Sequence, residues 1–314
     1  MTTSPTPTGA HQEALKALKD IVGTEHVLTS ERTTMAYSKG YRFGGGPLLA
    51  VLRPTTLVQM WKALQVCVDH NFMVIPQASN TGLTGGSGPG FQDYDRPIVL
   101  ISTHLINRVH LINNAQEAIS LAGATLTHLT EELAPHGREP HSVIGSTSIG
   151  ASVIGGIANN SGGSQIRKGP AFTREAIYAR VNEQGKVEFI NHLGITLGED
   201  PETALQRLQE GDWSAQDVTP APADSSETEY AAHLRKMEPT PARYNANPEY
   251  LFEASGSAGK IMVFAVRTRT FPLEKNPAMF YIGTHSPREL EEIRRIFLQA
   301  DMPLPISGEY MGRS

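Results

Sequence analysis

The chain has 314 residues, of which 39% are hydrophobic and 19% charged, a composition typical of an ordinary soluble globular protein with a buried core. Its formal net charge of -5 gives no electrostatic reason to expect a nucleic-acid partner, which would require a basic surface. The single cysteine, Cys67, excludes a disulfide within the chain and is compatible with a reducing compartment such as the cytoplasm.

The first part of the chain predicts a strand–helix–strand unit that leads into a glycine-rich loop. Apolar spacing from Ala10 to Val22 predicts an opening amphipathic helix. Leu48–Leu52 predicts a buried strand, an apolar helical face that includes Cys67 follows it, and Met73–Pro76 predicts a second strand. We therefore expect two parallel strands joined by a right-handed crossover, with the loop at the end of the sheet where α/β folds bind ligands.

The following elements indicate a domain of two lobes. One parallel unit followed by a strand-rich part predicts an α+β fold with a ligand held between the lobes. Residues 211–246 contain few large apolar groups and predict an insertion or linker that crosses the surface. A short helix is expected within Pro248–Glu253. The remaining expected elements are strands at Ile98–Ser102, Ala118–Ala122, Ile177–Asn182, Val187–Asn191 and Lys260–Val266, and a helix at Leu126–Ala134.

The last residues predict the beginning of another unit. A strand from Met279 to Gly283 and a helix that begins at Ser286-Pro287 and runs to Ala300 are expected. Such a unit cannot bury its own apolar face. The sequence therefore predicts a first domain over residues 1–273 and, over 274–314, the start of a truncated α/β cap that would hold substrate.

The first stretch with chemical potential is ASNTGLTGGSG, Ala78–Gly88. Its small residues allow backbone amides to converge on an anion, and Asn80 and Thr81 add hydrogen-bonding side chains. It has neither the lysine of a P-loop nor a GxGxxG that opens a helix. An isolated glycine cluster is more often a flexible turn, but this one follows a buried strand, which favours a cradle for a pyrophosphate.

The second stretch is Ser142–Ser164, an apolar segment with six glycines. Glycines at this density let the backbone approach a flat ring system, although a tightly packed helix would explain them equally well. The tail Asn159-Asn160-Ser161-Gly162 favours a turn or a ligand contact.

Both stretches, together with EASGSAGKIMVFAV at Glu253–Val266, resemble the flavoprotein family of vanillyl-alcohol oxidase and para-cresol methylhydroxylase. Within that family the chain is most similar to the bacterial quinone-dependent D-lactate dehydrogenases. The segments that carry this likeness extend over most of the chain: QASNTGLTGGS, GREPHSVIGS, IGASVIGGIANNSGGS, NHLGI, TPARYNANP and EKNPAMFYIGT.

The resemblance implies a two-lobed FAD-binding domain of the para-cresol methylhydroxylase type and a noncovalently held FAD. Neither His nor Cys, the residues that tether flavin in some relatives, occurs in the first loop. The FAD pyrophosphate would lie on the first loop, and the second stretch and the Val263 strand would add contacts. The implied FAD-binding residues are Ala78, Ser79, Asn80, Thr81, Gly82, Gly86, Ser87, Gly145, Ser152, Gly162 and Val263.

The resemblance also implies a reaction and a location. D-lactate would lose a hydride to the flavin and a proton to a base, giving pyruvate, and the electrons would pass to a membrane quinone. Peripheral attachment to the cytoplasmic face of the inner (plasma) membrane would follow, through a surface expected beyond Ser314, and the fragment itself would be soluble in the cytoplasm. No apolar run is long enough for a transmembrane segment.

The catalytic base and the substrate-binding cation cannot be assigned from these residues. Arg42 in KGYRFG and His141 in EPHS are candidates, but a solvated arginine and a loop-stabilising histidine are the commoner roles. His136, Glu139 and His141 fit no zinc signature, so no metal site is predicted. Three alternatives stay open: another D-2-hydroxy-acid dehydrogenase, an NADPH-using flavin reductase of the same fold, or an FAD-binding fragment without turnover.

Overall fold

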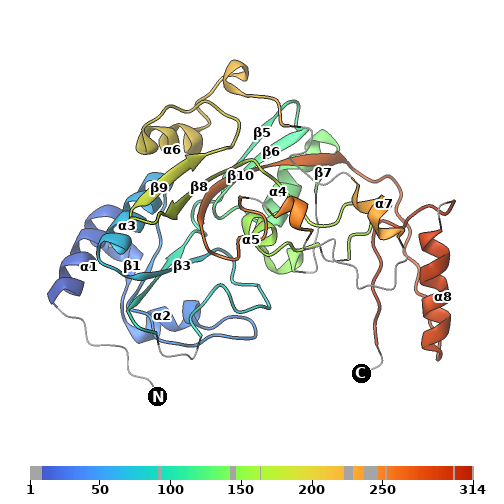
Figure 1. Ribbon diagram of the computed structural model, residues 1–314, viewed down its shortest axis with the longest axis horizontal. Coiled ribbons are helices and arrows are strands. Elements are labelled where there is room, and N and C mark those ends of the chain that lie inside the picture. Colours follow the sequence, from blue (N-terminus) through green and yellow to red (C-terminus); the bar gives the residue numbers. More distant parts are fainter. Residues whose placement is uncertain are drawn as a thin grey trace.

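A computed structural model describes residues 9–90, 94–141, 146–162, 164–222, 229–236, 247–251, 253–299 and 301–312. Figure 1 shows the body of the molecule, with helix α8 set apart at one end. The helices are α1 (Gly9–Val22), α2 (Glu31–Ser38), α3 (Leu57–Asp69), α4 (Leu126–Leu133), α5 (Val153–Ala158), α6 (Pro201–Glu210), α7 (Tyr230–Leu234) and α8 (Pro287–Leu298). The strands are β1 (Val27–Leu28), β2 (Ala50–Leu52), β3 (Met73–Gln77), β4 (Ile98–Ser102), β5 (Val109–Ile112), β6 (Glu117–Leu121), β7 (Arg138–Pro140), β8 (Ala176–Val181), β9 (Val187–Asn191) and β10 (Met262–Pro272).

The first lobe contains a four-stranded sheet in the order β1-β2-β4-β3. Strands β2 and β3 are parallel, as predicted, but they are not neighbours, because β4 lies between them and pairs with both. All five residues of β4 are buried, whereas four of the five residues of β3 are only half-buried. The most buried strand therefore takes the centre of the sheet, between the two strands that the sequence predicted to be parallel.

Helices α1 and α3 cover this sheet, and both were predicted. Thr56 caps α3 by accepting a hydrogen bond from the backbone N–H of Gln59, which satisfies one of the unpaired donors of the first turn. Cys67 is fully buried on the inner face of α3, as expected, and burial raises the pKa of its thiol to about 12.

The second lobe contains an antiparallel sheet in the order β5-β6-β10-β8-β9, and β7 pairs with the far end of β10. Strand β10 has 11 residues and is bonded on both sides, by β6 and by β8. The predicted strands of this lobe are confirmed. Strands β5 and β7 were not predicted, because they are short and most of their residues are only half-buried.

One apolar core joins the lobes through α3. The ring of Trp61 on α3 meets the rings of Phe189 on β9 and Phe264 on β10 edge-on, with centroids 5.6 Å and 6.3 Å away. Edge-to-face pairs of this kind add about 0.5–1.5 kcal/mol each to the burial of their area. The two sheets are therefore fixed relative to each other by aromatic packing.

The buried side chain of Arg267 ties the surface segment after α6 to the second sheet. Arg267 on β10 is fully buried and donates two hydrogen bonds to the Glu117 carboxylate, of 2.9 and 2.8 Å. Its remaining terminal nitrogen donates to the carbonyl of Thr219, at 2.9 Å. Helix α6 itself was not predicted, although Asp200 caps it and Gly211 ends it in the left-handed conformation that favours glycine.

The segment after β10 differs from its prediction at one point. The expected helix is confirmed as α8, but residues 279–283 form no strand, and the side chains of Met279, Phe280 and Tyr281 are about four-fifths exposed. A strand needs a hydrogen-bonding neighbour, and among the described residues none lies beside this run. Further on, the chain returns to the body, where Ile166 donates to the carbonyl of Ile306 and Gly308 donates to that of Ser164.

Within the part of the chain that the structure describes, the helices are too short or too polar to cross a membrane.

Candidate FAD site

The first glycine-rich loop directly follows β3 and is held by side chains at its base. Asn80, in the left-handed conformation (φ 54), donates to the carbonyl of Lys39 at 3.0 Å and accepts from the hydroxyl of Ser87 at 2.7 Å. Gln77 donates to the carbonyls of Tyr37 and Ser87, at 2.9 and 2.5 Å. The side chains of Asn80 and Ser87 therefore shape the loop.

The outer part of the loop is open. Gly82 and Gly86 are exposed, and a methyl group added to either would meet no atom within 4 Å. The hydroxyl of Ser79 is buried and has no hydrogen-bond partner among the described residues. An unsatisfied buried hydroxyl beside bare glycines is the arrangement expected where a ligand supplies the missing partner.

The second glycine-rich stretch forms α5 and the turn after it. Ser152 precedes the helix, and its hydroxyl accepts from the N–H of Gly155 at 3.1 Å, so this hydroxyl serves as a helix cap. Gly162 lies buried just after the helix. Gly145, another predicted FAD contact, lies outside the described residues.

The three segments that carry the family likeness meet at α5. Thr84 of the first loop donates to the Asn159 side chain at the end of α5, with an oxygen–oxygen distance of 3.4 Å. The loop after Glu253 reaches α5 from another side, because Gly256 and Ala258 donate to the carbonyls of residues 157 and 158. Val263 on β10 belongs to the same apolar cluster as residues 153 and 157 of α5. The two glycine stretches therefore lie side by side, as the sequence suggested.

Comparison with known proteins identifies this arrangement. Residues 48–187 match the family model of an FAD binding domain. Residues 279–314 match a second model, described as D-lactate dehydrogenase, membrane binding. We had expected the membrane-docking surface beyond Ser314, whereas this match begins at residue 279.

Curated relatives confirm the likeness of the chain to the quinone-dependent D-lactate dehydrogenases. The quinone-dependent D-lactate dehydrogenase of Corynebacterium glutamicum is 79% identical over 98% of this chain, which covers 54% of that protein. The protein of the same name from Haemophilus influenzae is 52% identical over 96% of the chain, again covering 54% of the relative. The chain thus spans about half the length of the curated relatives it matches.

Solved structures confirm the predicted fold class. Alkyldihydroxyacetonephosphate synthase matches 87% of the flavoprotein chain with a TM-score of 0.56 at 12% identity, and 42% of that protein is covered. Para-cresol methylhydroxylase matches 85% of the chain with a TM-score of 0.50 at 14% identity, and 44% of it is covered. At such identities the likeness establishes the fold, a two-lobed FAD-binding domain of this type.

The catalytic candidates from the sequence occupy different settings. Arg42 is exposed at the tip of a tight hairpin closed by Lys39 and Gly44. This is the setting expected for a solvated arginine. His141 is buried against Phe271, where burial, and after it the charges of Lys168 and Arg269, lowers its pKa to about 3.

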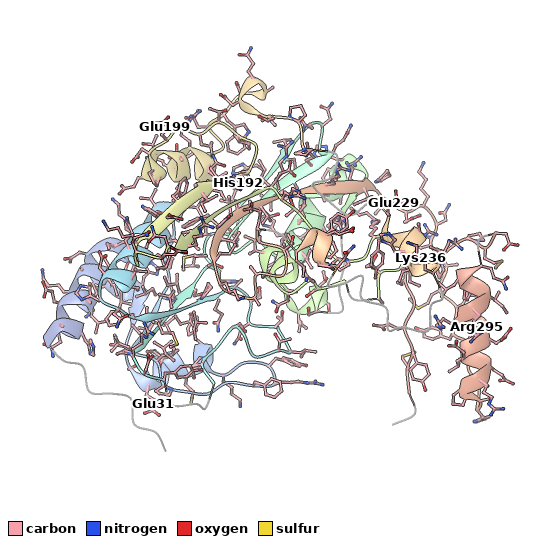
Figure 2. All side chains as sticks on the ribbon, in the orientation of Figure 1. Glu31, His192, Glu199, Glu229, Lys236 and Arg295 are labelled. Atoms are coloured by element: carbon pink, nitrogen blue, oxygen red, sulfur yellow. The ribbon has the colours of Figure 1, made fainter. Side chains whose placement is uncertain are left out.

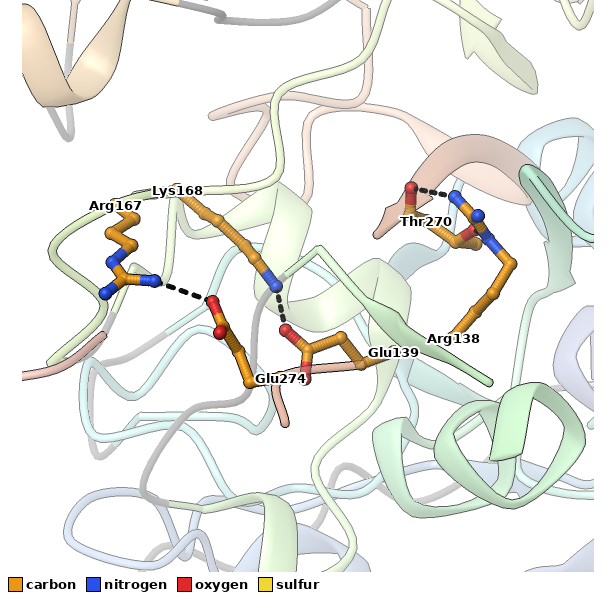
Figure 3. Close-up of polar contacts among 6 residues, drawn as sticks. All are labelled: Arg138, Glu139, Arg167, Lys168, Thr270 and Glu274. Atoms are coloured by element: carbon orange, nitrogen blue, oxygen red, sulfur yellow. Dashed lines mark hydrogen bonds and ion pairs between the residues drawn. The ribbon is translucent and has the colours of Figure 1, made fainter. Parts of the chain in front are cut away.

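One residue of the His136, Glu139 and His141 group is engaged in an ion pair. Glu139 is paired with Lys168 (Figure 3), and their side chains are only 18% and 12% exposed. Nowhere in the described ranges do three His, Cys, Asp or Glu side chains come together in a way that could hold a metal ion.

Sequence reasoning missed a polar cluster beside Val263. Tyr178 on β8 pairs with Val263, and burial, followed by a hydrogen bond to Glu253, raises the pKa of Tyr178 to about 12. Glu253 also contacts His192 at 2.8 Å, and Figure 2 labels His192 close to β8. Both NHLGI and EASGSAG carry members of this cluster, but their separation in the sequence concealed the contact.

Proposed function

We propose that this chain forms the FAD-binding part of an enzyme that oxidises D-lactate to pyruvate and passes the electrons to a membrane quinone. The observation that carries the proposal is the 79% identity, over 98% of the chain, to a quinone-dependent D-lactate dehydrogenase. The open glycines of the first loop and the contact of Thr84 with α5 support it, because they leave the glycine backbone uncovered beside the second glycine-rich stretch.

The first loop would hold the pyrophosphate of FAD. Its backbone amides and the unpartnered hydroxyl of Ser79 supply donors, and Gly82 and Gly86 admit the anion without a steric barrier. Gly162 and Val263 would contact other parts of the molecule, and Ser152 would do so through its backbone, since its hydroxyl caps α5. Bound FAD supplies the redox chemistry by accepting the hydride, and the protein contributes binding, orientation and exclusion of water.

FAD would be held noncovalently. Residues 78–88 contain no His or Cys, and Cys67 is buried in the core of the first lobe. A covalent tether requires a side chain that reaches the flavin ring, and Cys67 lies inside the apolar core.

Attachment to a membrane would be peripheral and on its cytoplasmic face. Residues 279–314 match the membrane-binding model, and within them Met279, Phe280 and Tyr281 expose large apolar side chains. Aromatic side chains of this kind are favoured at the boundary between lipid headgroups and water.

We leave the catalytic base and the substrate-binding cation unassigned.

A second candidate keeps the cofactor and changes the substrate. The D-2-hydroxyglutarate dehydrogenase of Danio rerio is 31% identical over 37% of the chain, so another D-2-hydroxy acid would also be compatible with the FAD-binding lobes. A third candidate is an FAD-binding chain without turnover.

The visible absorption spectrum with FAD, recorded without oxygen, tests these candidates. Flavin bands that bleach with D-lactate, and not with L-lactate or D-2-hydroxyglutarate, are the expected result for D-lactate oxidation. Bleaching by D-2-hydroxyglutarate alone would favour the second candidate, and bands that persist with every substrate would favour the third. A chain that retains no flavin would refute the proposal.

A glycine variant tests the placement of FAD. Gly86→Leu adds bulk where no protein atom stands within 4 Å, so it should prevent FAD binding while the melting temperature of the flavin-free chain stays unchanged. The exposed neighbour Leu83 provides the control, since Leu83→Ala should leave FAD binding intact. Unchanged FAD affinity in Gly86→Leu would contradict the placement.

A further inference from the structure

A surface beside the first glycine-rich loop exposes several large apolar side chains. It is formed by the last turn of α2, the hairpin of residues 39–44 and the outer part of the loop. Its apolar members, each at least 49% exposed, are Met35, Tyr41, Phe43 and Leu83. Exposed apolar patches rimmed by polar residues mark sites of contact with another protein or with a membrane. We call these residues, together with Lys39 and Arg42, the hairpin surface.

The hairpin is held in place by the body of the protein. A backbone bridge between Lys39 and Gly44 closes it, and Asn80 of the first loop donates to the Lys39 carbonyl at 3.0 Å. Gly44 has a φ of 107, a conformation that favours glycine. A methyl group added to Gly85 of the loop would lie 3.1 Å from Cβ of Phe43, so hairpin and loop pack directly on each other. The exposed side chains therefore project from a fixed support.

The charged side chains of the hairpin surface are both positive. Lys39 and Arg42 are exposed, and neither forms an ion pair within the part of the chain that the structure describes. The sequence has no Asp or Glu between Glu31 and Asp69, and residues 78–88 contain none either. The chain as a whole carries a formal net charge of -5. The hairpin surface is therefore locally positive on an acidic protein.

The size and charge of the hairpin surface favour a lipid bilayer over a protein as its partner. A specific protein interface buries roughly 800 Å² on each partner, more than a few side chains at two loop tips supply. In a symmetric pair of chains, the two sets of cations would face each other and repel. Aromatic side chains are favoured at the boundary between lipid headgroups and water, and lysine and arginine are attracted to anionic lipids.

We propose that the hairpin surface is a second membrane contact, in which Tyr41 and Phe43 enter the headgroup layer of an anionic bilayer and Lys39 and Arg42 bind lipid phosphates. The inference rests on the proposed function, since it adds to the peripheral attachment described there. The partner is the lipid surface itself and not a protein embedded in it.

Two separate contacts fix the orientation of the protein on the membrane. Figure 1 shows α2 and α8 well apart along the molecule and both in the lower half of the view, so one flat bilayer is able to meet both. The hydrogen bond from Asn80 joins the hairpin to the first loop. The hairpin contact therefore holds the proposed FAD site close to the lipid phase, in which a membrane quinone dissolves.

Co-sedimentation of the full chain with vesicles tests the contact. Vesicles of phosphatidylcholine mixed with phosphatidylglycerol supply the anionic surface, and vesicles of phosphatidylcholine alone supply a neutral one. Tyr41→Ser combined with Phe43→Ser should lower the partition coefficient at least about tenfold, because the burial of two rings is lost. Arg42→Gln should lower it about fivefold on the anionic vesicles and leave binding to the neutral vesicles unchanged.

A tryptophan at the hairpin tip measures insertion directly. Phe43→Trp keeps an aromatic ring in the hairpin, and lipids with brominated acyl chains quench a tryptophan that enters the bilayer. Trp61 is only 5% exposed and Trp213 is half-buried, so the parent chain provides the background. Quenching in Phe43→Trp should exceed this background on brominated anionic vesicles.

The hairpin between β8 and β9, on the other lobe, provides matched controls. Val181→Ser removes an apolar side chain that is 52% exposed, and Lys186→Gln removes an exposed cation near the turn. Both controls should bind vesicles like the parent chain. The melting temperatures of all variants should equal that of the parent, because every substituted side chain is exposed.

Three results would overturn the inference. Parent-like binding of the Tyr41→Ser and Phe43→Ser double variant, or no extra quenching in Phe43→Trp, would exclude the hairpin from the bilayer. If Phe280→Ser then abolished vesicle binding, the attachment through residues 279–314 would stand alone. A chain dimer that the double variant dissociates would make a second copy the occupant. A parent chain that binds no vesicles would overturn this contact and the proposed membrane attachment together, and leave D-lactate oxidation to its own spectroscopic test.

Discussion

Replacing Arg267 with methionine should destabilise the protein strongly, because it removes one partner of a buried ion pair. The guanidinium is fully buried and donates three hydrogen bonds of 2.8–2.9 Å, two to Glu117 and one to the Thr219 carbonyl. Methionine leaves the Glu117 carboxylate, itself 12% exposed, without a counter-charge. Removing one member of such a pair costs about 3–5 kcal/mol, a large part of the roughly 5–15 kcal/mol that stabilises a typical domain.

Urea unfolding followed by tryptophan fluorescence measures the loss. Glu117→Gln together with Arg267→Met should cost less than Arg267→Met alone, since the double variant leaves no unpaired charge. The exposed pair Arg180–Glu188, with side chains 54% and 38% exposed, provides the control, and Arg180→Met should cost less than about 1 kcal/mol. The reasoning fails if Arg267→Met costs no more than Arg180→Met, or if the double variant is the least stable of the series.

Three further predictions concern single side chains. Because burial raises the pKa of Cys67 to about 12, the thiol should resist iodoacetamide at pH 8 in the folded chain and react with it in urea. If iodoacetamide labels the folded chain as fast as the chain in urea, this prediction is wrong. Gly169→Ala should lower the free energy of unfolding by roughly 1–3 kcal/mol, measured in urea, since the added methyl group would lie 2.5 Å from the Tyr230 ring and the backbone has a positive φ. Burial lowers the pKa of His141 from 6.5 to about 3, so between these pH values the unfolded chain binds a proton that the folded chain does not. The free energy of unfolding should therefore fall by up to about 1.4 kcal/mol per pH unit as the pH drops from 6 to 3. His141→Phe should show a smaller fall across that range.

The sequence was sufficient for elements whose apolar pattern is complete within themselves. Helix α3 and strands β4 and β9 follow from local periodicity, and β4 and β9 have the predicted bounds. The order of strands in the first sheet was not accessible in this way, since it depends on which strand is buried on both faces. Residues 279–283 were wrongly predicted as a strand. Their apolar run favours a strand, but the described residues offer no neighbour to pair with it.

For the site, the glycine pattern identified the segments but not the roles of the side chains between them. Asn80 and Ser152 were predicted to contact FAD, and the structure adds that the Asn80 side chain shapes the loop and the Ser152 hydroxyl caps α5. Gln77 holds the base of the first loop, and no local signal distinguishes it from any other residue at the end of a strand. The hydrogen bond from Asn80 to Lys39 joins residues 41 positions apart in the sequence, so only the fold reveals it.

The position of β10 has a consequence for how the protein is made. All strands of the first sheet have been synthesised once Ser102 is added, so that lobe is able to form early. The middle of the second sheet arrives only with Met262–Pro272, long after β6 and β8, the strands that it joins. During that interval the inner edges of β6 and β8 lack the strand that pairs with both, so the second lobe is exposed to wrong pairing for longer than the first.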